Sequence, residues 1–430
     1  MLKSLANKEN GWIRLGVPSY KSETDKRMFV RKSGLRYCAI GLFVLAGFAV
    51  QAEVCQAARY YVGNNGSDSR SRSQAEDRST PWQNIRHAMN QVSGGDEVIV
   101  LDGTYYENVF ITRSGYDGGE IILRAENKRA ARIFGSISAQ DQSYIRIDGF
   151  DVTNSSSTGQ TKGIAFTRCH HITIRSNRVR DCWGGGIGCD QSDWILIEWN
   201  LVHENAFFNP EQHSGISIYQ PQYRSSDSRT YGIIIRNNTS FGNWNWVDNP
   251  RFGRPTDGNG IVADDYFNSQ SSGNGVPYNR QTIIENNLCY NNGGQGIHCF
   301  KAQNIQIRNN TCVNNMGAFD FGGEVTVSES ERIYIYNNVL QARTGRRAAL
   351  QFRSENFWFG FNIIDGPTQD VPFSESNHYG DPNFRFNSFV PESFSPAINS
   401  GRNAGDHYSK EIYGRNRIVD QIDRGAFEQQ

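Results

Sequence analysis

From residue 143 onward the chain repeats a short segment in which hydrophobic and polar positions alternate. Its clear copies read ITIRSN, ILIEWN, IIIRNN, TIIENN, IQIRNN, IYIYNN and FWFGFN. The positions five and three before the closing asparagine are almost all isoleucine, whereas the positions four and two before it vary and are often polar. Such alternation predicts a β-strand with one buried face.

The closing asparagines define the period of the repeat. They are Asn177, Asn200, Asn238, Asn287, Asn310, Asn338 and Asn362. Successive members are 23, 38, 49, 23, 28 and 24 residues apart. The unit is therefore a coil of about 23 residues, and the excess is loop. The residue two after each asparagine is mostly apolar or small, which predicts a second inward-facing strand.

A third strand begins in each repeat after a variable gap, with GIAFT at 163, GIGCD at 186, GISIY at 215, GIVAD at 260, GIHCF at 296, GEVTV at 323 and AALQFR at 348. Three short strands per coil predict an all-β fold, a right-handed parallel β-helix solenoid. Stacked asparagines would form a ladder, because asparagine tolerates the left-handed conformation of a tight bend and its amide can hydrogen-bond the next coil.

A column of charges tests the register independently. The residues two before the repeat position alternate in sign from coil to coil: Asp148, Arg175, Glu198, Arg236, Glu285 and Arg308. Coils stack about 4.8 Å apart, so each charge would face an opposite one above and below. We interpret this column as structural.

The two ends of the solenoid need caps. Residues 80–92 predict a short amphipathic helix with Thr80 as its N-cap, followed by a strand at 98–103. The organisation we predict is a signal-peptide region at 1–57, an N-terminal cap and first coils at 58–142, the β-helix core at 143–366, and an irregular tail at 367–430 that packs on the helix.

Residues 37–50 form an apolar run of 14 that follows several basic side chains. This pattern predicts a cleaved signal peptide, with Met28 as an alternative start, and hence a secreted or periplasmic protein. The run is too short for a membrane span, and no later segment reaches the roughly 20 apolar residues that one needs.

The chain has 44 basic and 44 acidic residues, so its net charge does not indicate binding to nucleic acid. We expect a monomer.

Six cysteines remain after the signal region. Cys289 and Cys312 share an inward column on successive coils, so a disulfide and a stacked pair of thiols are both allowed. Cys189 and Cys299 share another inward column but lie three coils apart.

Several strings resemble secreted bacterial β-helix proteins of the pectate-lyase-like superfamily. They are RYYVGNNGSD, PWQNIRHAM and GGDEVIVLDGTYYENV near the start, and SPAINSG and DRGAFE near the end. The resemblance covers essentially the whole mature chain, and the superfamily holds lyases, hydrolases, epimerases and non-catalytic adhesins. It implies that the GI-x strands form the sheet whose outer face carries the substrate cleft.

Counting from each glycine assigns the outward positions of these strands. One column holds Ser217, Val262 and His298, and the other holds Asp190, Tyr219, Asp264 and Phe300, with Arg353 further along. The next position starts a turn and holds Gln191, Gln220, Asp265 and Lys301. The longest loops flank the same coils, at 205–214, 221–230, 242–259 and 266–280, and would wall a groove.

These residues predict a lyase that cleaves an acidic, uronate-containing polysaccharide by β-elimination. Lys301 is the candidate base, as in pectate lyases that pair a lone lysine with an aspartate-bound calcium, and His298 and Asp264 are further catalytic candidates. Asp257, Asp264 and Asp265 are the predicted calcium ligands, although the DDGxD-type cluster of that family is not reproduced. The predicted substrate-binding residues are Trp244, Trp246, Arg254, Tyr219 and Arg353.

Other interpretations fit the same residues. Lys301 and Asp265 could form an ordinary ion pair between coils, and both tryptophans could pin a long loop. A hydrolase of the polygalacturonase type would use Asp264 and Asp265 with His298 and Lys301, although the GHG string of that family is absent. A C5-epimerase and a non-catalytic glycan-binding protein are further alternatives.

Overall fold

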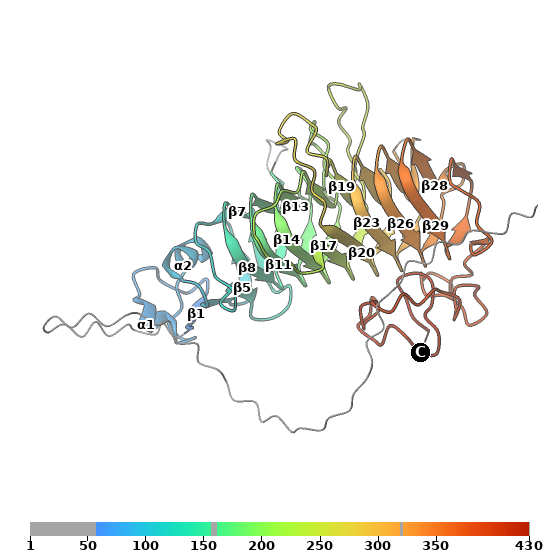
Figure 1. Cartoon of the computed structure of the whole chain (residues 1–430). Helices are drawn as coiled ribbons and strands as arrows, with labels where there is room; N and C mark the ends of the chain where they lie inside the picture. The colour runs from blue at the N-terminus through green and yellow to red at the C-terminus, as the bar shows by residue number, and fades with distance from the viewer. Residues whose placement is uncertain (1–56, 156–160, 319–320, 430) are drawn as a thin grey trace, which may run out of the picture. The chain divides into compact units, whose positions relative to one another are not determined.

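The computed structural model describes residues 57–155, 161–318 and 321–429. The signal-peptide prediction for 1–57 therefore lies almost entirely outside the described residues. Within them the chain winds into a solenoid of three parallel sheets (Figure 1), which confirms the predicted right-handed parallel β-helix. No helix among the described residues is long and apolar enough to cross a membrane.

Each full coil contributes one strand to each sheet, in the order first, second, third. The first sheet contains β4 (Val109–Ile111), β7 (Ile137–Gln140), β10 (Ile164–Thr167), β13 (Ile187–Asp190), β16 (Ile216–Tyr219), β19 (Ile261–Asp264), β22 (Ile297–Phe300), β25 (Gly323–Ser328), β28 (Arg347–Phe352) and β31 (Thr368–Gln369). The second contains β1 (Arg59–Val62), β2 (Glu97–Val100), β5 (Ile121–Ala125), β8 (Ser143–Asp148), β11 (His170–Arg175), β14 (Asp193–Glu198), β17 (Tyr231–Arg236), β20 (Gln281–Glu285), β23 (Gln303–Arg308), β26 (Glu331–Tyr336) and β29 (Glu355–Gly360). The third contains β3 (Gly103–Tyr105), β6 (Ala131–Phe134), β9 (Asp151–Thr153), β12 (Arg178–Arg180), β15 (Leu201–His203), β18 (Thr239–Phe241), β21 (Leu288–Tyr290), β24 (Thr311–Val313), β27 (Val339–Gln341), β30 (Ile363–Asp365) and β32 (His378–Tyr379).

The predicted asparagine ladder lies at the corner between the second and third sheets. The carboxamide oxygen of Asn310 accepts hydrogen bonds from the backbone N–H and the side chain of Asn287, each at 3.0 Å. Its own NH₂ group donates to the carbonyl of Ile284 and to the oxygen of Asn338. The same pattern runs from Asn177 to Asn377, so the buried corner amides are satisfied away from water.

The left-handed residue at this corner is not the ladder asparagine but the residue before it. Asn237, Asn286, Asn309 and Asn337 have φ values of 55°, 56°, 53° and 56°. The prediction therefore placed the strained position one residue too late. These four side chains point away from the core and donate to backbone carbonyls of the C-terminal tail instead.

A second ladder, which we did not predict, lies at the corner between the third and first sheets. Asn205, Asn243, Asn292 and Asn315 repeat the same bonds from coil to coil. The ladder ends on the buried carboxyl group of Glu324, which accepts both the backbone and the side-chain amide hydrogens of Asn315. Burial raises the pKa of Glu324 to about 8.

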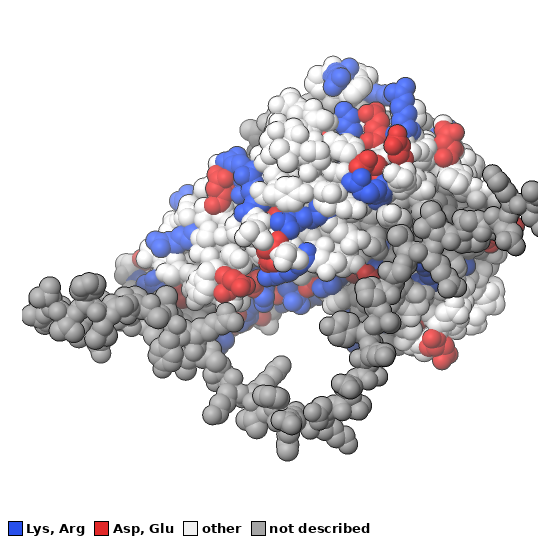
Figure 2. Space-filling model, viewed as in Figure 1, with Lys and Arg blue, Asp and Glu red and all other residues white. Residues whose placement is uncertain are grey.

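The charge column has the predicted register. Arg175 pairs with Asp148 and Glu198 on its two neighbouring strands, and Arg308 pairs with Glu285 at 2.9 Å. Charged side chains of both signs are interspersed over the face in Figure 2, which shows no extended patch of one sign there.

Two short helices, α1 (Arg72–Ala75) and α2 (Ile85–Gln91), lie at the N-terminal end of the described chain. The predicted N-cap at Thr80 is wrong, because α2 starts after Asn84. The segment before it is extended, and Trp82 bonds to the backbone of Tyr61. The carboxylate of Glu107 accepts from the first two backbone N–H groups of α2, at 2.8 and 2.9 Å.

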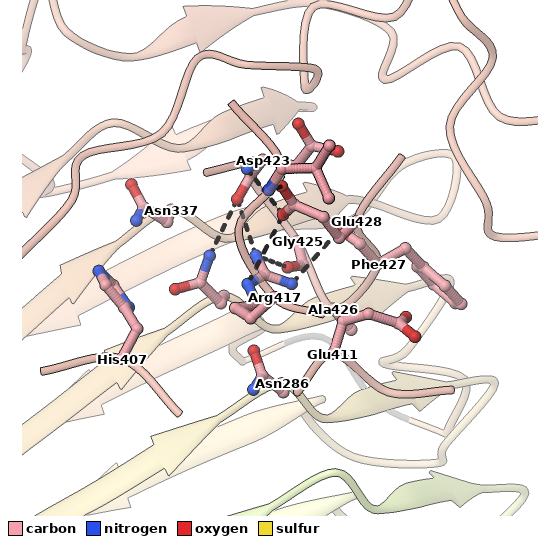
Figure 3. Close-up of polar contacts among 12 residues, drawn as sticks. Asn286, Asn337, His407, Glu411, Arg417, Asp423, Gly425, Ala426, Phe427 and Glu428 are labelled. Atoms are coloured by element: carbon pink, nitrogen blue, oxygen red, sulfur yellow. Dashed lines mark hydrogen bonds and ion pairs between the residues drawn. The ribbon is translucent and has the colours of Figure 1, made fainter. Parts of the chain in front are cut away.

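The C-terminal tail is organised around one buried cation (Figure 3). The guanidinium of Arg417 donates to the carbonyl oxygens of Asp423, Gly425 and Phe427. The Asp423 carboxylate accepts from the backbone of Asn399, which joins the string SPAINSG to the string DRGAFE. The two C-terminal strings of the resemblance therefore form one structural motif.

The six cysteines of the described chain are all buried free thiols. Cys289 and Cys312 occupy paired positions of β21 and β24, so the stacked thiol pair is the form in this structure. Cys189 and Cys299 lie in one inward row three coils apart, as the register predicted.

We expect Asn310→Ala to lower the free energy of unfolding by about 2–4 kcal/mol, because it leaves the backbone N–H of Asn287 buried without an acceptor. Chemical denaturation of wild type and variant measures this. Asn274→Ala, in an exposed loop, is the control and should change stability by less than about 0.5 kcal/mol. Equal losses in the two variants would show that the ladder is not a stabilising element.

Candidate functional site

The outer face of the first sheet carries two rows of side chains. One of these outward rows, which we call the inner row, is covered by neighbouring residues and holds Gly188, Ser217, Val262, His298 and Thr326. The second row is partly exposed and holds Asp190, Tyr219, Asp264, Phe300 and Ser328. We call the second row, together with Asp257 and Lys301, the polar strip.

The predicted register is right for these residues but wrong for Arg353. Phe352, not Arg353, continues the second row, because it pairs with Ser328. Arg353 lies one position later, with φ 49°, at the bend where Asp265 and Lys301 have φ values of 50° and 47°. It stands two coils beyond Lys301, away from the other candidate residues.

Long loops flank the polar strip along both edges of the first sheet. Residues 204–215 and 242–260 lead from the third sheet into β16 and β19, and residues 220–230 and 265–280 lead from these strands to the second sheet. These connections project from the solenoid near β13 and β19 (Figure 1). The four predicted loops therefore flank the same two coils.

Two neighbouring carboxyl groups lie between these loops. Asp264 accepts a hydrogen bond from Gln270 at 2.9 Å, and Asp257 accepts one from Asn259 at 2.9 Å. Burial raises the pKa of Asp257 to about 7. The pKa of Asp264 is raised well above its usual range, first by burial and then by the charges of Asp257 and Asp265. At neutral pH this pair holds a proton and offers both an acid and a base.

Asp265 is fully buried and faces its own loop. Its carboxylate accepts four hydrogen bonds, from Gln220, from the backbone and hydroxyl of Ser269, and from the backbone of Gln270. These donors occupy the oxygens that a cation would need. No group of three or more His, Cys, Asp or Glu residues is arranged for a metal in the described parts of the chain. The predicted set of three calcium ligands therefore does not fit this geometry.

Lys301 lies at the edge of the strip. Its ammonium is 5.4 Å from the centre of the Phe300 ring, and its charge offsets a small part of the rise in the pKa of Asp264. Among the described contacts it makes no ion pair with Asp265, whose oxygens are taken by the loop. The ammonium is thus available to an anionic group.

His298 belongs to the buried inner row, with 9% of its surface exposed. Burial lowers the pKa of its imidazole to about 4, so the ring is neutral at pH 7. Its Nδ1 atom has no hydrogen-bond partner among the described residues. His298 is therefore an uncharged neighbour of the strip.

The sequence analysis missed Lys162. Its ammonium bonds both oxygens of Asp190, at 2.9 and 2.7 Å, and a Cβ at Gly188 would lie 2.4 Å from its Cδ atom. The glycine in an otherwise substituted outward row was the available signal. Burial, with a smaller effect of the Lys162 charge, lowers the pKa of His213 well below its usual value.

The two tryptophans of loop 242–259 have different environments. Trp244 packs against Gly293 and Gly317 and donates to the carbonyl of Asn291 at 3.3 Å, so it pins the loop. Trp246 is 59% exposed and stacks on Phe207 with ring centres 4.2 Å apart.

Of the other predicted substrate-binding residues, Tyr219 belongs to the polar strip and Arg254 lies in the loop before β19. The hydroxyl of Tyr219 is 3.2 Å from that of Ser272 in the loop beyond β19. Arg254 is exposed, and its guanidinium lies 5.0 Å from the centre of the Phe321 ring.

Three parallel sheets wound into one solenoid, with a loop-flanked polar strip on the first sheet, define a right-handed parallel β-helix protein. The chain belongs to the family described as "Right handed beta helix region", whose profile matches residues 98–340. A curated relative, the uncharacterized protein YwoF of Bacillus subtilis (strain 168), is 28% identical over 135 residues. That match covers 28% of this chain and 28% of the relative, so the chain spans less than a third of its length.

Comparison with solved structures finds similar chains at low sequence identity. Pectate lyase Pel9A is 17% identical, with 87% of this chain and 97% of that chain covered and a TM-score of 0.48. The A-module of the Azotobacter vinelandii mannuronan C-5 epimerase AlgE4 is 14% identical, with 75% and 100% covered and a TM-score of 0.37.

We expect Trp244→Ala to lower the free energy of unfolding by about 2–4 kcal/mol, since it removes a ring packed between coils. Trp246→Ala should cost less than about 1 kcal/mol. Denaturation measures both, and electrophoresis through gels that contain an acidic polysaccharide measures retention. We expect Trp246→Ala to weaken retention at least fivefold. Unchanged retention would show that Trp246 takes no part in substrate binding.

Proposed function

We propose that this protein is a secreted enzyme that cleaves an acidic, uronate-containing polysaccharide by β-elimination on the polar strip. The observation that supports this most is the pair Asp257 and Asp264, with raised pKa values, beside the ammonium of Lys301. Both carboxyl groups hold a proton more readily than ordinary aspartates, so they oppose the attraction of Lys301 for a uronate less than two fully ionised carboxylates would.

Elimination needs a base, an acid and a positive charge. A base removes the C5 proton of the uronate, the C4–O bond breaks, a C4=C5 double bond forms, and the leaving oxygen takes up a proton. We assign the base to Asp257, whose pKa of about 7 lets it accept a proton at neutral pH. We assign the acid to Asp264, because its pKa is raised well above its usual range, first by burial.

Lys301 acts on the carboxylate of the uronate in this proposal. Its positive charge lowers the cost of the negative charge that develops when C5 loses its proton. The alternative, in which Lys301 is itself the base, predicts a different response to Lys301→Arg. His298 is neutral and buried, so we give it no proton-transfer step.

A hydrolase is the second candidate, because two carboxyl groups with unequal proton affinities also fit the acid and base of a glycosidase. A panel of acidic and neutral polysaccharides separates the possibilities. Ultraviolet absorbance of unsaturated products indicates elimination, new reducing ends alone indicate hydrolysis, and exchange of solvent deuterium at C5 without cleavage indicates epimerisation. Retention without any of these indicates a binding protein.

The same panel tests calcium. No step of the proposed mechanism uses a cation, because the carboxylate of Asp265 already accepts hydrogen bonds from its own loop and from Gln220. Activity should therefore survive chelation. A loss that added calcium restores would reinstate the calcium prediction, with Asp257, Asp264 and the substrate carboxylate as ligands.

The pH profile follows from Asp257. Its pKa is raised from the usual value to about 7, so below pH 7 it is protonated and cannot accept the C5 proton. We expect kcat/KM to rise tenfold per pH unit up to about 7 and then to level off, and Asp257→Asn to be inactive with an unchanged fold. Activity that falls above pH 7 would make Asp257 the acid and contradict the assignment.

We expect Lys301→Ala to lower kcat/KM by about 10² or more, with the larger share in kcat, because its charge acts mainly in the transition state. Lys301→Arg should keep a tenth or more of the activity if the role is electrostatic, whereas a lysine base would make it inactive. Full activity of Lys301→Ala would remove the residue from the mechanism. Arg353→Ala, two coils further along, is the control.

A further inference from the structure

A cleft of about 620 Å³ lies on another face of the solenoid, between the second sheet and residues 402–406 of the tail. Its lining includes Gln281, Gln306, Tyr334, Trp358, Arg402 and Asp406. None of these residues belongs to the polar strip.

An outward row of the second sheet forms one wall. Gln306, Tyr334 and Trp358 occupy paired positions on β23, β26 and β29. Tyr334 is 42% exposed, so its ring is open to a ligand. Exposed aromatic faces on a rigid sheet suit the apolar faces of pyranose rings.

Two side-chain amides in the cleft, those of Gln281 and Gln306, have atoms that could hydrogen-bond a ligand. The side-chain oxygen of Gln306 accepts from the hydroxyl of Tyr336 at 2.8 Å, which fixes the amide. Its NH₂ group, and the whole amide of Gln281, have no hydrogen-bond partner among the described residues. These groups match hydroxyl groups of a sugar.

Two charged side chains line the cleft, the cation Arg402 and the anion Asp406. Asp406 is already paired, because its carboxylate accepts from Arg308 at 2.6 Å and from the hydroxyl of Tyr231. Arg308 in turn pairs with Glu285 at 2.9 Å. The guanidinium of Arg402 lies 5.3 Å from the centre of the Trp358 ring and makes no ion pair with the described residues. One guanidinium is thus left to receive a carboxylate.

We propose that this cleft is a second, non-catalytic saccharide site, in which a pyranose ring stacks on Tyr334, Gln281 and Gln306 bind hydroxyl groups, and Arg402 binds a uronate carboxylate. That its ligand is part of the polymer cleaved at the strip rests on the proposed function. Two sites on one rigid solenoid would raise the residence time of the protein on a long polymer without changing the reaction.

The full chain with Tyr334→Ala or Arg402→Gln tests the site, in gels that contain polygalacturonate, alginate or neutral dextran. We expect at least a fivefold higher apparent Kd on an acidic polymer for each variant, with unchanged melting temperature. Phe386→Ala, an aromatic that is 92% exposed on the same tail, is the matched control and should bind like wild type. Cleavage of short oligosaccharides should be unchanged.

The outcomes separate the two proposals. Equal retention of Tyr334→Ala and wild type overturns the second site, whether or not the protein cleaves. Loss of retention in Tyr334→Ala without cleavage of any polymer by the wild type supports the second site and overturns the proposed function. Loss of retention in Tyr334→Ala with none in Arg402→Gln overturns the uronate as its ligand.

Discussion

The buried amides at the corner between the second and third sheets constrain the whole solenoid. Each must find an acceptor away from water, and the ladder asparagine of the next coil supplies it. That bond leaves no room for insertions, so two residues separate the strands at this corner throughout the ladder, as from Arg308 to Thr311. Every long insertion in these coils therefore falls at the other two corners, which are the edges of the first sheet. The ladder thus determines where a walled site can form.

The same corner also holds the C-terminal tail. From Asn177 to Asn362 the residue before each ladder asparagine is left-handed, and in four coils it is an asparagine that donates to a tail carbonyl. Within the tail, the guanidinium of Arg417 donates hydrogen bonds to the carbonyl oxygens of Asp423 and Gly425. Residues 402–406 are consequently held over the second sheet, where they complete a cleft that neither part has alone.

Periodic features could be predicted from the sequence, and features of the loops could not. Isoleucine alternation and charge alternation fix the register of the second sheet. The glycine that opens each strand of the first sheet fixed the rows through Asp190, Tyr219 and Asp264, and these rows were right. Arg353 was misplaced by one residue because the last coils lack the glycine that marks the count. The ion pair of Lys162 with Asp190 and the hydrogen bonds of Asp265 within its own loop depend on loop conformations. The loops do not follow the repeat, so these contacts could not be predicted from it. The second ladder had a signal, an asparagine five residues after the first, but it was hidden among other asparagines.

A raised pKa alone does not mark a functional group in this fold, as Glu324 shows. Its pKa is about 8, yet it has a structural duty, since it accepts the last amide hydrogens of the second ladder. Asp257 and Asp264 each accept only one side-chain hydrogen bond among the described contacts, and no ladder ends on them. An acid whose pKa is raised by folding destabilises the fold as pH rises from its ordinary pKa to the raised one. Two such acids side by side lower the stability of the fold at neutral pH, and neither closes a ladder as Glu324 does. The proposed reaction at the strip would explain why they are there.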